Sequence, residues 1–332
     1  MTAEAVARTL HAMVAQGPSA RVAGPGDSGG GKPVIAVRGL RKRYGEHEAI
    51  RGIDLEVRRG EIFAFLGPNG AGKTTTVEIL EGFRRATAGE VSVLGADPWG
   101  APPSWRERIG IVLQESAPEP GLTVRECLEL YAGYFQAPRS VPDTLALVGL
   151  AEQGSERATA LSGGQRRRLD VALALIGDPE LVFLDEPTTG FDPAARRVAW
   201  AMIEGLRELG KTVFLTTHYM EEAERLADRI AVIVDGAIAA EGAPHTLGDR
   251  QRAAARIIFS LPRGTTLADL PAGLIGRAQS ESSGRIALTS GTVTADLHAL
   301  SGWALERSLE LEDLEVRRPT LEEIYLRLTE AS

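Results

Sequence analysis

The chain contains the run Gly67-Pro68-Asn69-Gly70-Ala71-Gly72-Lys73-Thr74-Thr75, which matches the pattern Gly-x-x-x-x-Gly-Lys-[Ser/Thr]. This run follows the apolar segment Glu61–Leu66, a predicted strand, and opens a predicted helix that reaches about Glu81. Glycines let backbone N–H groups turn inward toward phosphates, and a helix N-terminus favours an anion. Lys73 would neutralise the β- and γ-phosphates, and the Thr74 hydroxyl would face Mg²⁺. We therefore predict a phosphate loop that binds a nucleotide, rather than a structural glycine turn.

Short apolar segments alternate with helical ones on both sides of this loop. The predicted strands are Val34–Val37, Ile53–Val57, Val91–Leu94, Ile109–Leu113, Leu181–Leu184, Val213–Thr216 and Ile230–Val234. A long helix is predicted from Pro193 to Leu209, with proline in its first turn. The segment from about Thr123 to Gly177 is mostly helical in pattern. This order predicts an α/β core with a parallel sheet and an inserted helical lobe.

Two carboxylates follow the buried strand that begins at Leu181. They are Asp185 and Glu186, and ligands of open α/β sheets lie at the carboxyl ends of such strands. Asp185 is then placed to hold Mg²⁺ or its water shell, and Glu186 to polarise a water aimed at the γ-phosphate. The alternative is a strand that ends in a solvated Asp-Glu turn.

A second glycine motif, Leu161-Ser162-Gly163-Gly164-Gln165, precedes the acidic strand and opens a helix from Arg166 to Ile176. Together with the phosphate loop it resembles the signature of ABC-type ATPases. The order of this motif with Gln114, Asp185-Glu186, Asp192 and His218 resembles the whole motif set of that family. The resemblance covers about residues 34–248. It implies a P-loop NTPase of ABC type with a mixed sheet and a helical subdomain at about 115–178.

The resemblance also implies a role for each matching residue. The residues expected to hold ATP are Tyr44 against adenine, the loop from Gly67 to Thr75, then Ser162, Gly163, Gly164, Gln165 and Asp192. The expected catalytic residues are Glu186, His218 and Gln114, and the expected Mg²⁺ ligands are Thr74, Gln114 and Asp185. Phe191 stands where the family usually has leucine, which should change little because both are apolar.

One chain carries one phosphate loop and one signature motif, and on a rigid domain both cannot reach the same nucleotide. We therefore expect two copies to pair head to tail, with each ATP between Lys73 of one copy and Ser162 of the other. A two-fold arrangement of this kind suits a homodimer.

A closer resemblance comes from the segment that begins at Leu215, from Glu241-Gly-Ala-Pro, and from Arg317-Arg-Pro-Thr-Leu-Glu-Glu-Ile-Tyr-Leu326. These segments are similar to the daunorubicin/doxorubicin-resistance branch of bacterial exporters. The resemblance implies a drug, antibiotic or lipid-like substrate and a separate transmembrane permease. Residues 115–160 would dock this permease, unless they only support the signature helix. The alternatives are a soluble ABC ATPase that acts on nucleic acid or ribosomes, and a non-catalytic regulator.

The composition is that of an ordinary globular chain, with 332 residues, 43% hydrophobic, 25% charged, one cysteine and a net charge of −8. The acidic balance argues against a nucleic-acid partner. No apolar run is long enough to span a membrane, so we expect a cytoplasmic protein that is peripheral on the inner face of the cell membrane. Residues 1–33 are predicted to be a flexible tail. Residues 249–332 are predicted to be a small α+β accessory domain, with strands at Ile257–Leu261 and Ile286–Thr289 and helices at 293–300 and 320–329.

Overall fold

The computed structural model describes residues 32–112, 119–250, 253–262, 264–281 and 285–330. It divides into two compact units, the first running to Pro244 and the second beginning at His245. The expected boundary between residues 248 and 249 falls inside a short 3-10 helix of the second unit, η2 (Leu247–Asp249). The predicted tail, residues 1–33, lies outside the described residues up to position 31.

A six-stranded sheet forms the centre of the first unit, with the order β5-β6-β7-β3-β8-β9. Its strands are β3 (Ile62–Leu66), β5 (Ile109–Val112), β6 (Leu181–Asp185), β7 (Thr212–Thr217), β8 (Arg229–Val234) and β9 (Ala237–Gly242). Neighbouring strands are parallel except for the antiparallel pair β8–β9. The central strands are buried throughout, which is why they read as continuous apolar runs in the sequence. The predicted mixed α/β sheet is confirmed.

A second, three-stranded antiparallel sheet has the order β2-β1-β4. Its strands are β1 (Ile35–Tyr44), β2 (His47–Val57) and β4 (Ala88–Val93). The first two form one hairpin, so they are longer than the predicted segments Val34–Val37 and Ile53–Val57. The rest of each strand carries polar residues on its exposed face, so the sequence prediction, which relied on apolar runs, did not include it. This extension places Tyr44 at the end of β1.

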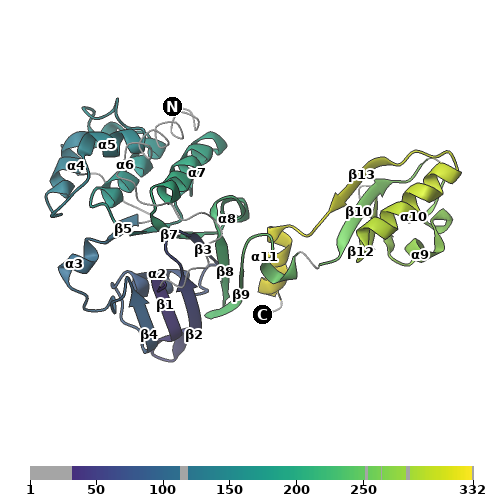
Figure 1. The fold of residues 1–332 in the computed structure, drawn as a ribbon, viewed down its shortest axis with the longest axis horizontal. Helices are drawn as coiled ribbons and strands as arrows, with labels where there is room; N and C mark the ends of the chain where they lie inside the picture. Colours follow the sequence, from purple (N-terminus) through teal and green to yellow (C-terminus); the bar gives the residue numbers. More distant parts are fainter. Residues whose placement is uncertain (1–31, 113–118, 251–252, 263, 282–284, 331–332) are drawn as a thin grey trace. The chain divides into compact units, whose positions relative to one another are not determined.

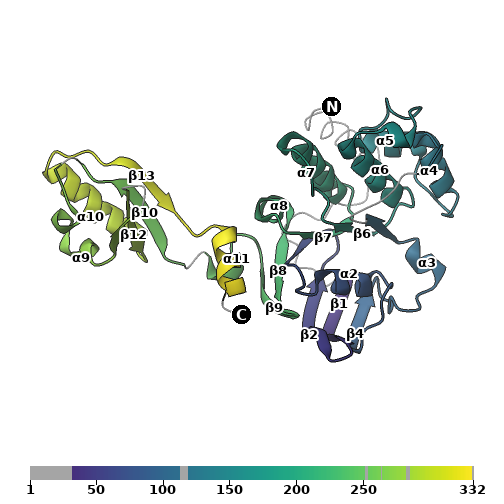
Figure 2. The same ribbon diagram turned by 180° about the vertical axis from the view of Figure 1, so that it is seen from behind.

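Helices cover the larger sheet and include the predicted inserted lobe (Figure 1). The lobe contains α4 (Val124–Ala132), α5 (Val141–Leu147), η1 (Ala158–Ala160) and α6 (Gly163–Leu175). The other helices of this unit are α2 (Lys73–Leu80), α3 (Pro103–Arg106), α7 (Pro193–Glu208) and α8 (Met220–Leu226). Helices α4–α7 lie above the six-stranded sheet in both ribbon views, and the three-stranded sheet lies below it (Figure 2).

The second unit is a four-stranded antiparallel sheet of order β11-β12-β10-β13 with helices packed on it. Its elements are β10 (Ala255–Ser260), η3 (Leu267–Asp269), α9 (Ala272–Ile275), β11 (Ala278–Ser280), β12 (Ile286–Ser290), α10 (Val293–Glu306), β13 (Glu312–Arg317) and α11 (Leu321–Glu330). Its core joins the sheet residues Ile257 and Phe259 to Leu300 and Trp303 of α10. The sequence prediction missed β11 and β13, the two edge strands, because both are short on apolar residues. Among the described residues, no helix combines the length and the apolar character that crossing a membrane requires.

Candidate functional site

The phosphate loop joins the end of β3 to the start of α2, as the sequence predicts. Gly70 and Gly72 have φ angles of 82° and 105°, in the left-handed region that disfavours residues with a Cβ. A Cβ at Gly67 would lie 2.4 Å from the carbonyl oxygen of Ile233. The glycines are therefore required by the backbone path and by the close approach of β8.

Lys73, the first residue of α2, is buried, and its side chain turns back over the loop. Its ammonium donates hydrogen bonds to the carbonyl oxygens of Gly67, at 2.7 Å, and Pro68, at 3.1 Å. Burial lowers the pKa of Lys73, whereas the nearby charges of Glu186 and Asp185 raise it. The structure thus brings the loop lysine and both strand-end carboxylates together.

The strand end at Asp185 is held by Thr216 of the neighbouring strand β7. The Thr216 hydroxyl donates to Oδ1 of Asp185, and the backbone N–H of Glu186 donates to the Thr216 carbonyl oxygen at 3.1 Å. Glu186 itself has a φ angle of 45°, which is uncommon for a residue with a side chain. The chain therefore turns sharply at the residue that carries the second carboxylate.

The Glu186 carboxylate lies beside His218, which follows the neighbouring strand β7. Its Oε1 is 3.3 Å from Nδ1 of His218, and its Oε2 accepts a hydrogen bond from the Thr189 hydroxyl at 3.0 Å. The Glu186 side chain is 14% exposed and that of His218 is 43% exposed. This pair is half-buried but open to a ligand, a setting suited to the handling of a water and a phosphate.

The signature motif caps helix α6. Ser162 is the N-cap, its hydroxyl accepts from the Gln165 N–H, and its own N–H donates to the Gln165 side chain at 2.8 Å. Such a capping box satisfies two of the helix's unpaired donors. Ser162 and Gly163 are exposed, and the space where a Cβ of Gly163 would lie is open. The contacts described above for Lys73 and for the Glu186 carboxylate are with residues other than this motif.

Two further predicted residues, Tyr44 and Asp192, contact other parts of the first unit. Tyr44 is 40% exposed, and Nζ of Lys42 and Cζ of Arg84 lie 5.1 and 5.4 Å from its ring centroid. Asp192 is exposed and caps helix α7 by accepting from the N–H groups of Ala194 and Ala195. Gln114 lies outside the described residues.

Two residues near the site were missed by the sequence prediction. Arg167 of α6 is buried and donates to the carbonyl oxygens of Asp185 and Pro187. Glu81, just after α2, is buried, and burial together with the charges of Asp185 and Glu78 raises its pKa to about 8. In the sequence, the only feature that points to Arg167 is its place in the helix that the signature motif opens. No sequence pattern points to Glu81.

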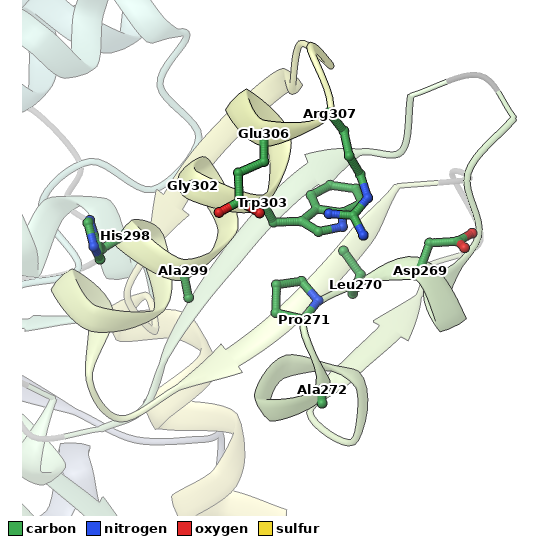
Figure 3. Close-up of a pocket in the computed structure, with 10 residues that line it drawn as sticks. All are labelled: Asp269, Leu270, Pro271, Ala272, His298, Ala299, Gly302, Trp303, Glu306 and Arg307. Carbon is green, nitrogen blue, oxygen red and sulfur yellow. The ribbon is translucent and has the colours of Figure 1, made fainter.

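The second unit has a pocket of about 520 Å³ between the segment around Pro271 and one face of α10 (Figure 3). Trp303 on this face is buried, and its indole N–H has no partner among the described residues. The Arg307 guanidinium lies over the same ring, at 5.7 Å from the centroid. No cluster of three or more histidine, cysteine or acidic side chains that could hold a metal occurs in the described ranges.

Known protein families match both units of the chain. A family model described as ABC transporter matches residues 50–189, and one described as the C-terminal domain of ABC transporter domain-containing proteins matches residues 255–320. The daunorubicin resistance ATP-binding protein DrrA3 of Streptomyces coeruleorubidus is 42% identical, over 89% of this chain and 95% of that protein. The Nod factor export ATP-binding protein I of Ralstonia nicotianae is 45% identical, over 67% of this chain and 71% of that protein.

The solved structures that resemble this chain are ATP-binding cassettes. An ATP-binding cassette of an ABC transporter in its ADP conformation aligns with a TM-score of 0.57 at 25% identity, covering 64% of this chain and 92% of that one. A cassette in a dimeric post-hydrolysis state bound to ADP and phosphate aligns with a TM-score of 0.56 at 26% identity, covering 63% and 98%. With the phosphate loop, the paired carboxylates and the signature motif on one α/β scaffold, the chain belongs to the ATP-hydrolysing, ATP-binding subunits of ABC transporters.

Proposed function

We propose that this chain powers a membrane exporter that works with a separate permease, and that its substrate is a drug, an antibiotic or a lipid-like compound. The observation that carries the proposal is the 42% identity to a daunorubicin resistance ATP-binding protein over 89% of the chain. That alignment is long enough to include the accessory domain as well as the ATPase domain. Other relatives are named for Nod factor export.

In this proposal ATP lies on the loop from Gly67 to Thr75, with its adenine against Tyr44 and its phosphates on Lys73. The Lys73 ammonium donates to two loop carbonyls in the structure, so it is already directed at the cradle that a phosphate would fill. A phosphate would replace these neutral acceptors with charged ones, which form stronger hydrogen bonds. Tyr44 is 40% exposed, which leaves part of its surface available to a base.

The available donors fit a magnesium ion. Mg²⁺ in nucleotide sites is held by one or two carboxylates together with phosphate oxygens and waters. Thr74 is exposed in the first turn of α2, and Asp185 lies near enough to Lys73 to raise the pKa of that lysine. Thr74, Asp185 and Gln114 would hold the ion, which would neutralise phosphate charge when bound.

Hydrolysis then depends on Glu186 and His218. Glu186 accepts hydrogen bonds, and its carboxylate would orient the attacking water toward the γ-phosphorus. His218 stands 3.3 Å from this carboxylate and would donate to the γ-phosphate. Catalysis of this kind is positioning together with charge neutralisation, because the phosphoryl group is transferred to water without covalent help from the protein.

Two copies would complete each site. Ser162 and Gly163 are exposed at the N-terminus of α6, and Gly164 beside them is half-buried; a helix N-terminus is the type of group that binds a phosphate. In the head-to-tail dimer this N-terminus would meet the γ-phosphate held by Lys73 of the other copy, and Asp192 would lie at the interface. ATP would close the dimer and hydrolysis would reopen it, a shift in population driven by the ligand.

The helical lobe would pass this motion to the permease on the inner face of the membrane. Leu130 of α4 and Tyr134, two residues beyond its end, are 45% and 70% exposed. Exposed apolar side chains of this size are suited to a protein contact. We assign residues 115–160 as the docking surface on this ground.

The test is an affinity pull-down of the tagged Glu186→Gln protein from detergent-solubilised native membranes in the presence of ATP. This variant should bind ATP and stay closed because it cannot orient the water. Recovery of a polytopic membrane protein supports the proposal, and the same pull-down with Lys73→Ala serves as the control that cannot close. Recovery of ribosomal or nucleic-acid partners without a membrane protein would overturn it.

A further inference from the structure

Arg167 connects the signature helix to the strand end that carries Glu186. Arg167 lies in the second turn of α6 and is 9% exposed. One terminal nitrogen of its guanidinium donates to the carbonyl oxygen of Asp185 at 2.8 Å, and Nε donates to the carbonyl oxygen of Pro187 at 3.3 Å. The guanidinium therefore binds the carbonyl of the residue before Glu186 and the carbonyl of the residue after it.

The backbone between those two carbonyls is strained. Glu186 has a φ of 45°, a left-handed conformation that costs free energy for any residue with a Cβ. Such a conformation persists only where the surroundings hold it, and it is found most often at functional sites. On the side of β7 the Glu186 N–H is held by the carbonyl and the hydroxyl of Thr216. From α6, Arg167 stabilises the same segment through its hydrogen bonds to the carbonyl oxygens of Asp185 and Pro187.

The Arg167 guanidinium is also fixed on its other sides. Asp170, one turn further along α6, has a carboxylate oxygen 4.0 Å from Arg167. Burial lowers the pKa of Arg167, and the charges of Asp170, Asp185 and the buried Glu222 oppose this shift. Glu222 in turn accepts from the Thr188 hydroxyl, at 2.8 Å, and from Trp200. The segment after Glu186 is thus bound to α8 as well as to α6.

We infer that Arg167 is a positioning residue that transmits the state of the signature motif to the Glu186 carboxylate. This inference rests on the proposed head-to-tail dimer. In that dimer the N-terminus of α6 contacts the ATP held by the other copy, whereas Glu186 serves the ATP held by its own copy. A displacement of α6 is carried by the guanidinium to the Asp185–Pro187 backbone. Engagement of one nucleotide therefore sets the catalytic geometry for the other, and the two ATPs are hydrolysed cooperatively.

The experiment compares Arg167→Lys and Arg167→Gln with Arg168→Lys. Arg168 is the matched control because it stands next in the same helix and donates to the carbonyls of Val148 and Gly149, within the lobe. Lysine keeps the charge but lacks the planar fork that reaches two carbonyls, and glutamine lacks the charge as well. ATP turnover is measured against ATP concentration for the purified chain and for its complex with the permease.

We expect kcat to fall about tenfold in Arg167→Lys and further in Arg167→Gln, because a small misplacement of a catalytic group is costly. The KM for ATP should stay within about twofold, since Lys73 and the loop are untouched, and the Hill coefficient should move toward one. Arg168→Lys should keep kcat and the Hill coefficient of the unmodified protein. This split separates positioning from a general loss of stability.

Two outcomes would overturn the inference. One is an unchanged kcat and Hill coefficient in Arg167→Gln. The other is an equal loss of kcat in the Arg167 and Arg168 variants that follows an equal fall in melting temperature. ATP-dependent dimerisation of Glu186→Gln is measured in parallel, by size-exclusion chromatography, because it reports on the proposed dimer without involving Arg167. Failure to dimerise there overturns the dimer and the coupling together, whereas a normal dimer with unchanged Arg167 variants overturns the role of Arg167 alone.

Discussion

The imidazole Nδ1 of His218 lies 3.3 Å from Oε1 of Glu186, and the two residues follow neighbouring parallel strands, β7 and β6. The contact exists because β6 and β7 are parallel, so both carboxyl ends reach the same edge of the sheet. Thr189 holds the other oxygen of the same carboxylate. The sheet therefore positions this pair.

Replacement of His218 by alanine should lower ATP turnover by about tenfold or more. The variant loses a donor to the γ-phosphate and a neighbour that restrains the Glu186 carboxylate. Nucleotide affinity, measured with a fluorescent ATP analogue, should change only a few-fold. His245→Ala is the control, because His245 is exposed and lies in the other unit. A normal turnover in His218→Ala would remove this histidine from the mechanism.

Much of this architecture is local in origin and could be predicted. The buried parallel strands read as uninterrupted apolar runs, the loop glycines are fixed by left-handed backbone, and Ser162 caps its own helix. Each of these signals depends on a few neighbouring residues, and the motif order then gave the family. The residues predicted to bind ATP and to catalyse its hydrolysis could be named because they belong to such motifs.

Features that depend on tertiary contact could not be predicted. The φ of Glu186 is set by Thr216 and Arg167, which reach it from other elements. The hairpin β1–β2 extends beyond its predicted segments through residues that include many exposed polar side chains, and the edge strands β11 and β13 carry few apolar residues. The burial of Glu81 likewise arises only when the chain folds.

Removal of the Lys73 ammonium should weaken ATP binding by about ten- to a hundredfold, as expected when charge-assisted hydrogen bonds to phosphate are lost. The measurement is isothermal titration of Lys73→Ala with ATP. Lys211→Ala is the control, since Lys211 pairs with Asp178 at 2.8 Å and has no role in the loop. Equal affinities of the two variants would contradict the phosphate assignment.

Tyr44→Ala should raise the KM for ATP by about five- to 150-fold, because stacking on a base contributes roughly 1–3 kcal/mol. Tyr44→Trp should keep the KM near that of the unmodified protein, since stacking needs a π-face and not a hydroxyl. The same assay on Tyr134→Ala, an exposed tyrosine of the helical lobe, should show no change. If Tyr44→Ala and Tyr134→Ala give the same KM, the adenine lies elsewhere.

Glu81 should make folding stability depend on pH. Its pKa is raised from 4.5 to about 8 in the folded protein, first by burial and then by the charges of Asp185 and Glu78. Between these two values the folded state retains a proton that the unfolded state has released. The contribution of Glu81 to folding stability is therefore fully present below about pH 4.5 and is lost as the pH rises toward 8.

The neutral isostere Glu81→Gln removes this titration. Urea unfolding at pH 6, 7 and 8.5 should show the unmodified protein losing on the order of a few kcal/mol relative to the variant across this range. Glu90→Gln, which changes an exposed carboxylate of β4, should keep the pH dependence of the unmodified protein. The burial of a protonated carboxyl beside Asp185 would be refuted if Glu81→Gln and the unmodified protein lost stability in parallel.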